Sequence, residues 1–306
     1  MKFEKNISII IVNYNVIELL LNCINSIYSN NTSTLEIEII LVDNNSTDGS
    51  VDVVALRFPE VHIITNKFNA GFPAANNQGI KIARGEFIFL LNPDTEILDD
   101  AIEKLMQFVE AQNTLCLVTP KLLNSDFTVQ KSIQRFITVK EIIAELFFLH
   151  DYMDKRKGYF QNLKRNEIIK VEALSGAAIM MKKEVIDKIG TLDVDLFWTE
   201  DMEFCYRANL HGIDRIYFPK ATIIHHQGQS GKKNMNVMLS NQVLSKIKFF
   251  KKNHSLLQYY TVLIFRLLHI ISRLLIFGFL SFFNKIYRSK FSAYFYTLKR
   301  FIKNDY

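Results

Sequence analysis

The sequence predicts an α/β fold in which a mostly parallel central sheet is covered by helices on both faces. Short, continuously apolar runs alternate with segments of helical spacing over roughly the first hundred residues. These runs do not alternate apolar with polar residues, which is typical of strands buried on both faces. Clusters of turn-forming and helix-capping residues separate the elements, as expected for strands that alternate with helices.

Each expected strand is a β-branched or aromatic run that ends in polar residues. The first run, ISIIIV at 7–12, is followed by Asn-Tyr-Asn, and the second, IEIILV at 37–42, by Asp-Asn-Asn. A third strand is expected at 61–65, and a fourth at 87–91 leads into Asn-Pro-Asp. Helical spacing predicts the other elements, which are helices at 16–28, 51–58, 74–83 and 202–210 and a helix that ends at Gly190.

The 306-residue chain is long enough for one large domain and an appendage, and its charge is divided unevenly. Residues 231–306 contain 14 Lys or Arg and one acid, whereas the first 230 residues contain 23 basic and 30 acidic residues. The acidic part lacks the basic footprint of a nucleic-acid-binding protein, so we expect no nucleic-acid partner. We expect a domain that carries the chemistry at 1–231 and a basic, apolar helical region at 232–306.

Open parallel sheets bind their ligands outside the carboxyl ends of the strands. Polar clusters follow the first, second and fourth expected strands at 13–15, 43–45 and 92–94, and all three fall at this edge. The sequence contains neither GxGxxG nor GxxxxGK[ST], so it has no dinucleotide fingerprint and no P-loop. A nucleotide at this edge must therefore be held by something other than a glycine-rich phosphate cradle.

Asp94 stands at the mouth of the fourth expected strand. A carboxylate is a hard oxygen ligand that suits Mg²⁺ or Mn²⁺. Because one carboxylate rarely holds such an ion alone, we expect substrate phosphates to complete its coordination. The residues leave a second interpretation open, in which Asp94 caps a helix at 97–109.

Two further positions carry candidate chemistry. Asp201 follows an aromatic stretch and precedes the expected helix at 202–210, where partial desolvation would make it a better general base. Its alternative role is to complement the dipole of that helix. His225 and His226 point to opposite sides of an extended chain, so only one of them is expected to bind a metal. The alternative is a strand-end histidine bonded to backbone.

An ordered set of motifs carries a family resemblance. The motifs are SIIIVNYN, LVDNNSTDGS, NAGFPAANNQGI, LLNPDT, SGAAIMMKKEVIDKIG, TEDMEFCYRANLHG and PKATIIHHQGQS. Together they resemble family 2 glycosyltransferases of the inverting, metal-dependent glycosyltransferase-A type, and within them the rhamnosyltransferase-like branch. The match covers roughly residues 5–231, and it implies a Rossmann-like, mostly parallel sheet with helices on both faces. The C-terminal helical region is expected to associate with membranes because of its own residues.

The resemblance also assigns roles to residues. It makes Asp201 the catalytic base, and Asp94 and His225 the ligands of Mg²⁺ or Mn²⁺. It places Trp198 and Glu200 on the acceptor side. Asn92 stands where relatives carry the first acid of an Asp-x-Asp motif, but many rhamnosyltransferase-like members share this Asn-Pro-Asp form. The residues expected to bind the nucleotide sugar are Asn13, Tyr14, Asp43, Asn69, Gly71, Asn76 and Asn92.

The implied reaction transfers a sugar, with dTDP-L-rhamnose as the first expectation and UDP-sugars as the other, to a hydroxyl of a glycan or lipid-linked acceptor. Such a reaction serves cell-surface polysaccharide or O-antigen synthesis. Two other functions stay open at this point. A nucleotidyltransferase on a similar fold would leave Asp201 and His225 unexplained. A non-catalytic scaffold that binds nucleotide sugars would be favoured by loss of Asp94, Asp201 or His225, all of which are present.

Residues 255–283 are very apolar, but Arg266 and Arg273 interrupt them, so no unbroken run reaches the ~18 residues of a transmembrane helix. Arg266, His269 and Arg273 form one stripe of a helix with basic residues on both flanks. The pattern indicates an in-plane amphipathic anchor that binds anionic lipid, peripherally at the cytoplasmic face of the inner (plasma) membrane. Alternatives are helices packed on the catalytic domain or on a homodimer partner, and a spanning or re-entrant helix.

Overall fold

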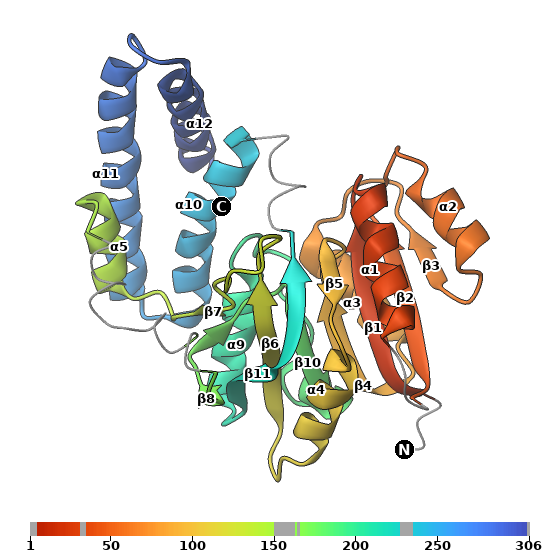
Figure 1. Ribbon diagram of the computed structural model, residues 1–306. Coiled ribbons are helices and arrows are strands. Elements are labelled where there is room, and N and C mark those ends of the chain that lie inside the picture. The colour runs from red at the N-terminus through yellow and green to blue at the C-terminus, as the bar shows by residue number, and fades with distance from the viewer. Residues whose placement is uncertain (1–4, 31–34, 150–162, 164–165, 227–234, 305–306) are drawn as a thin grey trace. The chain divides into compact units, whose positions relative to one another are not determined.

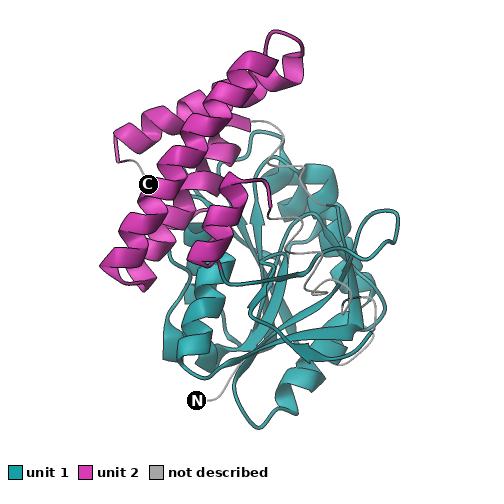
Figure 2. Ribbon diagram, turned by 90° about the vertical axis from the view of Figure 1, so that its left-hand side faces the viewer, with its two compact units in different colours: residues 1–136, 161–194, 200–230 teal, residues 137–160, 195–199, 231–306 magenta. Residues whose placement is uncertain are grey.

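The computed structural model describes residues 5–30, 35–149, 163, 166–226 and 235–304. The chain divides into two compact units, which Figure 2 shows in different colours. Residues 137–160 and 195–199 group with the C-terminal helices, although they precede residue 231 in the sequence. Unit 1 comprises Met1–Phe136, Gln161–Val194 and Glu200–Ser230, and unit 2 comprises Ile137–Phe160, Asp195–Thr199 and Gly231–Tyr306.

Among the described residues, unit 1 contains a nine-stranded sheet in the order β3-β2-β1-β4-β10-β6-β11-β5, with β8 paired to β11 (Figure 1). Strands β1 to β4 are parallel neighbours, and β6 is parallel to β11, whereas β10 runs antiparallel between β4 and β6. A separate pair joins β7 and β9. The strands are β1 (Lys5–Asn13), β2 (Ile37–Asp43), β3 (His62–Thr65), β4 (Gly85–Leu91), β5 (Thr95–Ile97), β6 (Cys116–Leu123), β7 (Ile133–Gln134), β8 (Ile169–Lys170), β9 (Ala173–Leu174), β10 (Ala178–Lys182) and β11 (Asp214–His225).

Helices cover both faces of this sheet, as the apolar strands predict. Ile7, Ile9 and Ile11 of β1 share one core with the buried faces of α1 and α4. The alternate residue Ile10 faces α3, which packs so closely that a Cβ on Gly79 would lie 2.5 Å from Ile10 Cγ2. The helices are α1 (Ile17–Ser29), α2 (Ser50–Arg57), α3 (Phe72–Ile82), α4 (Ala101–Glu110), α8 (Lys183–Ile189) and α9 (Glu200–Leu210).

The prediction of a helix at 97–109 is wrong about where that helix begins. Residues Thr95–Ile97 form β5, which pairs antiparallel with the end of β11, and α4 begins only at Ala101. Asp100 occupies the position before that helix, so Asp94 is not its cap. Residues 95–97 form a strand because the end of β11 is available as a partner. Pairing with it gives their backbone groups hydrogen bonds that the first turn of a helix does not provide.

The regular elements described in unit 2 are helices. Its segment α5 carries a capping box in which Thr138 and Glu141 satisfy each other's backbone amides, and Ser255 and Gln258 do the same for α11. Length and composition would allow α11 to span a membrane: its most apolar window has a mean hydropathy of 2.0, and 28% of that window is buried. The helices are α5 (Val139–Leu146), α10 (Met235–Asn253), α11 (Leu256–Leu280) and α12 (Lys285–Ile302).

The sequence predicted that the basic stripe of α11 would be the polar outer face of an in-plane anchor. The structure contradicts this prediction. Arg266, His269 and Arg273 are all buried within unit 2. Glu145 of α5 supplies the reason, since its carboxylate pairs with Arg266 inside the helical unit. The polar stripe of α11 therefore points inward, and the side chains that it leaves exposed are mainly apolar.

Candidate active site

Asp94 and His225 meet at the carboxyl edge of the sheet. The pairing of β11 with β5 places His225 opposite Thr95, directly beside Asp94. His225 Nε2 lies 3.2 Å from Asp94 Oδ1, and the two residues are only 7% and 5% exposed. A buried carboxylate beside a buried imidazole is a candidate site for a cation.

Gln130 fixes the orientation of the His225 ring. Its side-chain nitrogen donates to the backbone oxygen of His225 at 2.9 Å and to Asn124 Oδ1 at 2.8 Å. The amide oxygen of Gln130 is then the acceptor that faces His225 Nδ1 at 2.7 Å. The contact with Gln130 therefore places a proton on His225 Nδ1 and turns Nε2 toward Asp94, which is the ring orientation that metal-binding histidines use.

His226 is engaged elsewhere. Its Nε2 lies 2.7 Å from Glu96 Oε1, and its Nδ1 lies 2.7 Å from Ser125 Oγ. Its backbone amide donates to the backbone oxygen of Asp94 at 2.8 Å. The alternation of side chains along β11 thus separates the two histidines, and only the imidazole of His225 reaches the Asp94 carboxylate.

Asn92, which contacts this pair, carries a side-chain oxygen of the kind that a divalent cation takes as a ligand. Asn92 Nδ2 lies 3.5 Å from His225 Nε2, and Asn92 Oδ1 is buried without a hydrogen-bond partner among the described residues. In the part of the chain that is described, no cluster of three His, Cys, Asp or Glu residues could hold a metal. A divalent cation held only by Asp94 and His225 would leave coordination positions to substrate oxygens, which is the usual arrangement for Mg²⁺ with phosphates.

Asp201 lies in the first turn of α9, and three donors hold its carboxylate. Oδ2 accepts hydrogen bonds from Gln134 Nε2 at 2.8 Å and from the Gly176 amide at 2.9 Å, while Oδ1 accepts from the Met202 amide at 2.7 Å. Burial raises the pKa of Asp201, and these hydrogen bonds oppose the rise. The group is a fixed, partly desolvated carboxylate, which suits a general base.

A short run of backbone joins Asp201 to the corner that holds Asn92, Asp94 and His225. The Asn92 amide donates to the backbone oxygen of Ala177 at 2.9 Å, and the neighbouring Gly176 amide is the one that binds Asp201. A Cβ on Gly176 would lie 3.3 Å from Asp201 Cβ, so the absence of a side chain lets the carboxylate approach. Because β10 runs antiparallel to β4, its first residues lie at the edge where β4 ends.

The expected nucleotide-binding residues of the first two strands also meet. Asn13 and Asp43 are paired across β1 and β2, and Asn13 Nδ2 donates to Asp43 Oδ1 at 2.8 Å. The other carboxylate oxygen accepts from the Ser46 amide at 2.8 Å. Both residues are buried, so they shape the loop after β2, whereas Tyr14 beside them is exposed. Contact of Asp43 with a base stays a prediction.

The remaining expected nucleotide-side residues organise the start of α3. Asn69 Oδ1 accepts from the Gly71 amide at 2.9 Å, and Gly71 has a left-handed φ of 85° that an L side chain rarely adopts. Asn76 is buried and donates to the backbone oxygen of Phe72 at 2.9 Å. Asn44, which sequence reasoning did not single out, joins this loop to β2 by a hydrogen bond from the Ala70 amide at 3.3 Å.

The two residues expected on the acceptor side differ in placement. Glu200 is half-buried and opens α9, where a carboxylate is stabilised by the helix dipole. Trp198 belongs to unit 2, is 44% exposed and has a φ of 87°. A positive φ is costly for a bulky side chain, and such strain is concentrated at functional sites.

Gln130 and Gln134 are the site residues that sequence reasoning missed. They lie on one short segment, and they hold His225 and Asp201, respectively. The sequence of this segment, QKSIQ, has no motif that marks it. The signal that could have found it is that an imidazole and a carboxylate in buried places both need hydrogen-bond partners to hold them.

The chain belongs to Glycosyl transferase family 2, because residues 8–190, more than half of its length, match the sequence profile of that family. Among solved structures, it is similar to the mannosyltransferase PcManGT from Pyrobaculum calidifontis in complex with GDP-Man and Mn²⁺. That similarity has a TM-score of 0.58 at 16% identity and covers 100% of this chain and 88% of that chain. GalNAc-T7 with UDP, GalNAc and Mn²⁺ gives a TM-score of 0.57 at 15% identity over 81% of this chain and 51% of that one. The likeness confirms the predicted glycosyltransferase-A type fold.

Curated relatives match at moderate identity. The chain is 23% identical over 233 residues to the N-acetylglucosaminyl-diphospho-decaprenol L-rhamnosyltransferase of Mycobacterium tuberculosis, which covers 72% of this chain and 76% of that protein. It is 34% identical over 123 residues to the Poly(ribitol-phosphate) beta-glucosyltransferase of Bacillus spizizenii, which covers 39% of this chain. The chain spans only 19% of the length of that protein and 50% of Glycosyltransferase GlyG of Streptococcus pneumoniae.

Proposed function

We propose that this chain is an inverting glycosyltransferase that moves a sugar from a nucleotide-diphosphate sugar to a hydroxyl of a glycan or lipid-linked acceptor. The observation that carries the proposal is the pairing of Asp94 with His225 at 3.2 Å, beside a separately held carboxylate on Asp201. A charge-stabilising site next to a general base is what displacement of a diphosphate by a hydroxyl needs. Membership of family 2 supports the same reaction class.

Asp201 is the base in this proposal. Its carboxylate accepts the proton of the acceptor hydroxyl while that oxygen attacks the anomeric carbon from the face opposite the leaving group. One displacement inverts the configuration at that carbon, and a second nucleophilic carboxylate is not needed. Asp94 and His225 would hold Mg²⁺ or Mn²⁺, which supplies Lewis-acid stabilisation of the negative charge on the departing diphosphate.

Asn92 bears on the choice of donor. It contributes a neutral amide where an Asp-x-Asp site has its first carboxylate, so the metal would be held with one negative charge fewer. The similar protein from Mycobacterium tuberculosis is named as an L-rhamnosyltransferase. We therefore propose dTDP-L-rhamnose as the first donor to test, followed by UDP-sugars.

A panel of nucleotide sugars tests the proposal directly. The purified chain is incubated with each sugar and Mn²⁺ or Mg²⁺, with and without EDTA, and release of the nucleoside diphosphate is measured. We expect one donor to be hydrolysed or transferred in a metal-dependent way and to raise the melting temperature of the protein. If no donor is turned over and none stabilises the fold, the proposed activity is wrong.

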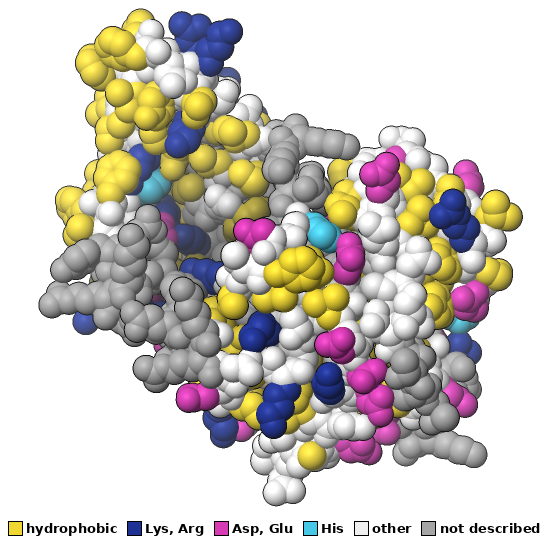
Figure 3. Space-filling view, viewed as in Figure 1, with side chains coloured by type: hydrophobic (Ala, Val, Ile, Leu, Met, Phe, Trp, Pro, Cys, Tyr) yellow, Lys and Arg dark blue, Asp and Glu magenta, His cyan; other side chains and the backbone are white. Residues whose placement is uncertain are grey.

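The proposal also includes peripheral attachment to the cytoplasmic face of the inner (plasma) membrane through unit 2. Hydrophobic side chains gather over α11 and its connection to α12, with basic side chains close by (Figure 3). Leu275 is 71% exposed, and Phe282 and Phe283 are followed by the exposed cations Lys285 and Arg288. Apolar anchors next to basic residues favour binding to membranes that contain anionic lipid.

Vesicle sedimentation tests this part. We expect the protein to sediment with vesicles that contain phosphatidylglycerol and Leu275→Glu to reduce the bound fraction severalfold. The matched control is Leu56→Glu on α2 of unit 1, because Leu56 is an equally large aliphatic residue and is 83% exposed. Equal loss of binding in the two variants, or none in either, contradicts attachment through α11.

A further inference from the structure

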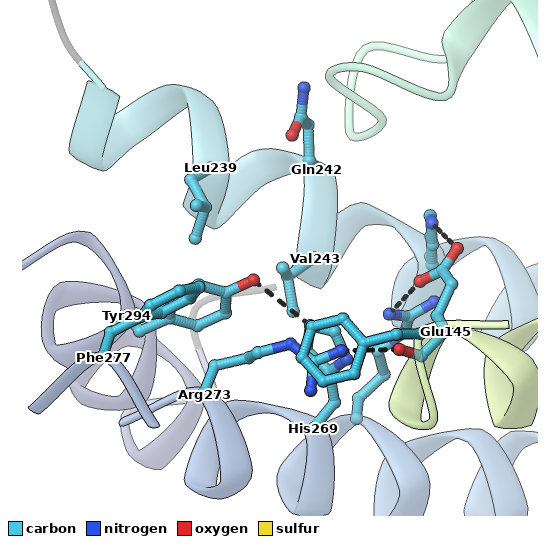
Figure 4. A pocket seen from close by; sticks show the side chains of 11 residues that line it. Glu145, Leu239, Gln242, Val243, His269, Arg273, Phe277 and Tyr294 are labelled. Atoms are coloured by element: carbon cyan, nitrogen blue, oxygen red, sulfur yellow. Dashed lines mark hydrogen bonds and ion pairs between the residues drawn. The ribbon is translucent and has the colours of Figure 1, made fainter. Parts of the chain in front are cut away.

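Unit 2 contains a cavity of about 430 Å³. It lies among the side chains of α5, α10, α11 and α12, and Figure 4 shows polar groups that point into it from several of these helices. Its lining combines apolar side chains with strongly charged ones. The lining residues are Glu145, Phe148, Leu239, Gln242, Val243, Lys246, Arg266, His269, Arg273, Phe277 and Tyr294.

Cations outnumber anions in this lining. Lys246, Arg266 and Arg273 face a single carboxylate, that of Glu145. Glu145 Oε1 lies 2.5 Å from Lys246 Nζ, and its Oε2 lies 2.5 Å from Arg266 Nη1. Both carboxylate oxygens are therefore occupied by cations, and the lining retains an excess of positive charge.

Arg266 is the group that lacks sufficient partners. Its side chain is 1% exposed, and Nε and Nη2 are buried with no hydrogen-bond partner among the described residues. A buried guanidinium with unsatisfied donors is costly unless an acceptor completes its hydrogen bonds. The planar fork of Arg matches the oxygens of phosphate and carboxylate groups.

Neighbouring groups are held in place around it. Arg273 donates from Nη2 to the Glu145 backbone oxygen at 2.7 Å, and its guanidinium lies 3.5 Å from the centre of the Phe148 ring. His269 Nε2 is 3.3 Å from the Tyr294 hydroxyl, while His269 Nδ1 is buried without a partner in the described part of the chain. The residues that line the cavity thus include buried nitrogens that lack hydrogen-bond partners within the described ranges, on side chains that their neighbours hold in place.

We propose that this cavity is a binding site for a phosphate or diphosphate group, held by Lys246, Arg266 and Arg273. A phosphate brings several acceptor oxygens and negative charge, which are the two properties that the lining lacks. A carboxylate would satisfy fewer donors and would neutralise less of the positive charge.

The surroundings favour a phosphate that is carried by a lipid. The face of α11 that does not line the cavity exposes apolar side chains, including Leu268, Leu275 and Phe279. A lipid whose headgroup occupies the cavity would leave it past Phe148, which lines the cavity and is 63% exposed, while the exposed face of α11 would enter the same apolar layer. This assignment of the source rests on the proposed function, in which the acceptor is lipid-linked, whereas anion binding by the cavity does not depend on it.

Calorimetric titration of the full chain with inorganic pyrophosphate tests the site. EDTA is included so that no metal at Asp94 contributes to binding. We expect saturable binding, weakened at least about tenfold by Arg266→Gln, because a hydrogen-bonded ion pair with phosphate would be lost. The matched control Lys251→Gln removes an exposed cation from α10 of the same unit and should bind as the unaltered protein does. Equal affinity in all three proteins overturns the proposal.

Glu145→Gln should change the affinity for pyrophosphate in the direction opposite to Arg266→Gln. Removal of the only carboxylate from the lining should strengthen pyrophosphate binding, and added pyrophosphate should raise the melting temperature of this variant more than that of the unaltered protein. Should Arg266→Gln fold poorly, Leu239→Trp fills the cavity without changing its charge, and it should abolish binding. Unchanged pyrophosphate affinity in both Glu145→Gln and Leu239→Trp overturns the site.

A third titration separates the sources of the phosphate. Farnesyl diphosphate in detergent is compared with pyrophosphate in the same detergent, and we expect the lipid form to bind at least about tenfold more tightly. Equal affinities refute the lipid source and leave an anion site. The nucleotide-sugar panel gives an independent answer, because loss of donor turnover would contradict the proposed function without altering pyrophosphate binding in unit 2.

Discussion

The imidazole of His225 lies 3.2 Å from the carboxylate of Asp94, with its Nδ1 proton directed to Gln130. This relationship depends on the antiparallel pairing of β5 with β11, which brings the ends of two distant segments together. It places a ring nitrogen and a carboxylate oxygen opposite each other in a nearly inaccessible place. A metal ion bound at this corner would take both atoms as ligands, and the predictions about the site begin here.

His225→Ala should weaken metal-dependent donor binding by about tenfold or more, because one of the two protein ligands is lost. His226→Ala is the control, since its side chain contacts Glu96 and Ser125 instead of Asp94. Titration of Mn²⁺ in the presence of a nucleotide sugar, followed by the shift in melting temperature, measures the effect. Equal responses of the two variants would count against His225 as a ligand.

Asp201→Asn should retain donor binding but lower the rate of transfer by about 10²-fold to 10⁴-fold, which is the usual contribution of a general base. The new side-chain NH₂ group at position 201 would also face one of the N–H groups that now donate to the Asp201 carboxylate. One hydrogen bond would then be lost, and we expect the free energy of unfolding to fall by about 1–3 kcal/mol. The control is Asp187→Asn on α8, which makes the same exchange of a carboxylate for an amide at an exposed position. Wild-type turnover in Asp201→Asn would show that another group is the base.

Substitution of Gln134 and of Gln130 should change two different properties of the site. Gln134 donates to Asp201 and lowers its pKa, so Gln134→Leu should raise that pKa further and shift the acidic limb of the kcat profile to higher pH. The sign follows because transfer needs the ionised carboxylate, which a lost hydrogen bond makes less stable. Gln130→Leu should instead weaken metal binding and leave the acidic limb in place. Identical pH profiles and metal affinities in the two variants would contradict these separate roles.

Much of unit 1 could be predicted from the sequence, because continuous apolar runs identify buried strands without any knowledge of their partners. The same runs place Asn13, Asp43 and Asn92 at one edge, since β1, β2 and β4 are parallel neighbours. The start of the helix after Asp94 could not be predicted in this way. Residues 95–97 form a strand only because the end of β11 is available for pairing, which is a non-local fact.

The remaining errors have the same origin. Gln130 and Gln134 are ordinary polar residues until the fold places them beside His225 and Asp201. The stripe of Arg266 and Arg273 has the spacing of an amphipathic surface helix, and local pattern alone would turn it outward. Its burial depends on Glu145, a residue of a segment whose role the sequence did not reveal.

Gly176→Ala should lower kcat with little change in the KM for the donor. The added Cβ would lie 3.3 Å from Asp201 Cβ, which is tighter than an ordinary contact, so the base must move. Gly212→Ala is the control, because Gly212 has a φ of 69° and open space around it. That change should cost about 1 kcal/mol of stability without touching the site. A normal kcat in Gly176→Ala would mean that the position of Asp201 is not critical.

The ion pairs of Glu145 should make unit 2 sensitive to acid. Burial alone would raise the pKa of Glu145, but Lys246 and Arg266 lower it to about 2. The unfolded chain therefore binds the proton at higher pH than the folded one, and the stabilisation is fully present above about pH 4.3 and is lost as pH falls toward 2. Glu145→Gln should accordingly be less stable than the unaltered protein by about 3 kcal/mol at pH 6.

That difference should shrink steadily as the pH is lowered from 4.3 to 2, since the carboxyl group of the unaltered protein is then neutral as well. Urea unfolding followed by the fluorescence of Trp198, the only tryptophan of the chain and a residue of unit 2, measures it. Asp195→Asn is the control, because its pair with Lys252 is exposed and solvent screening leaves little net stabilisation to lose. A stability difference for Glu145→Gln that does not change with pH would show that the buried ion pairs are not its cause.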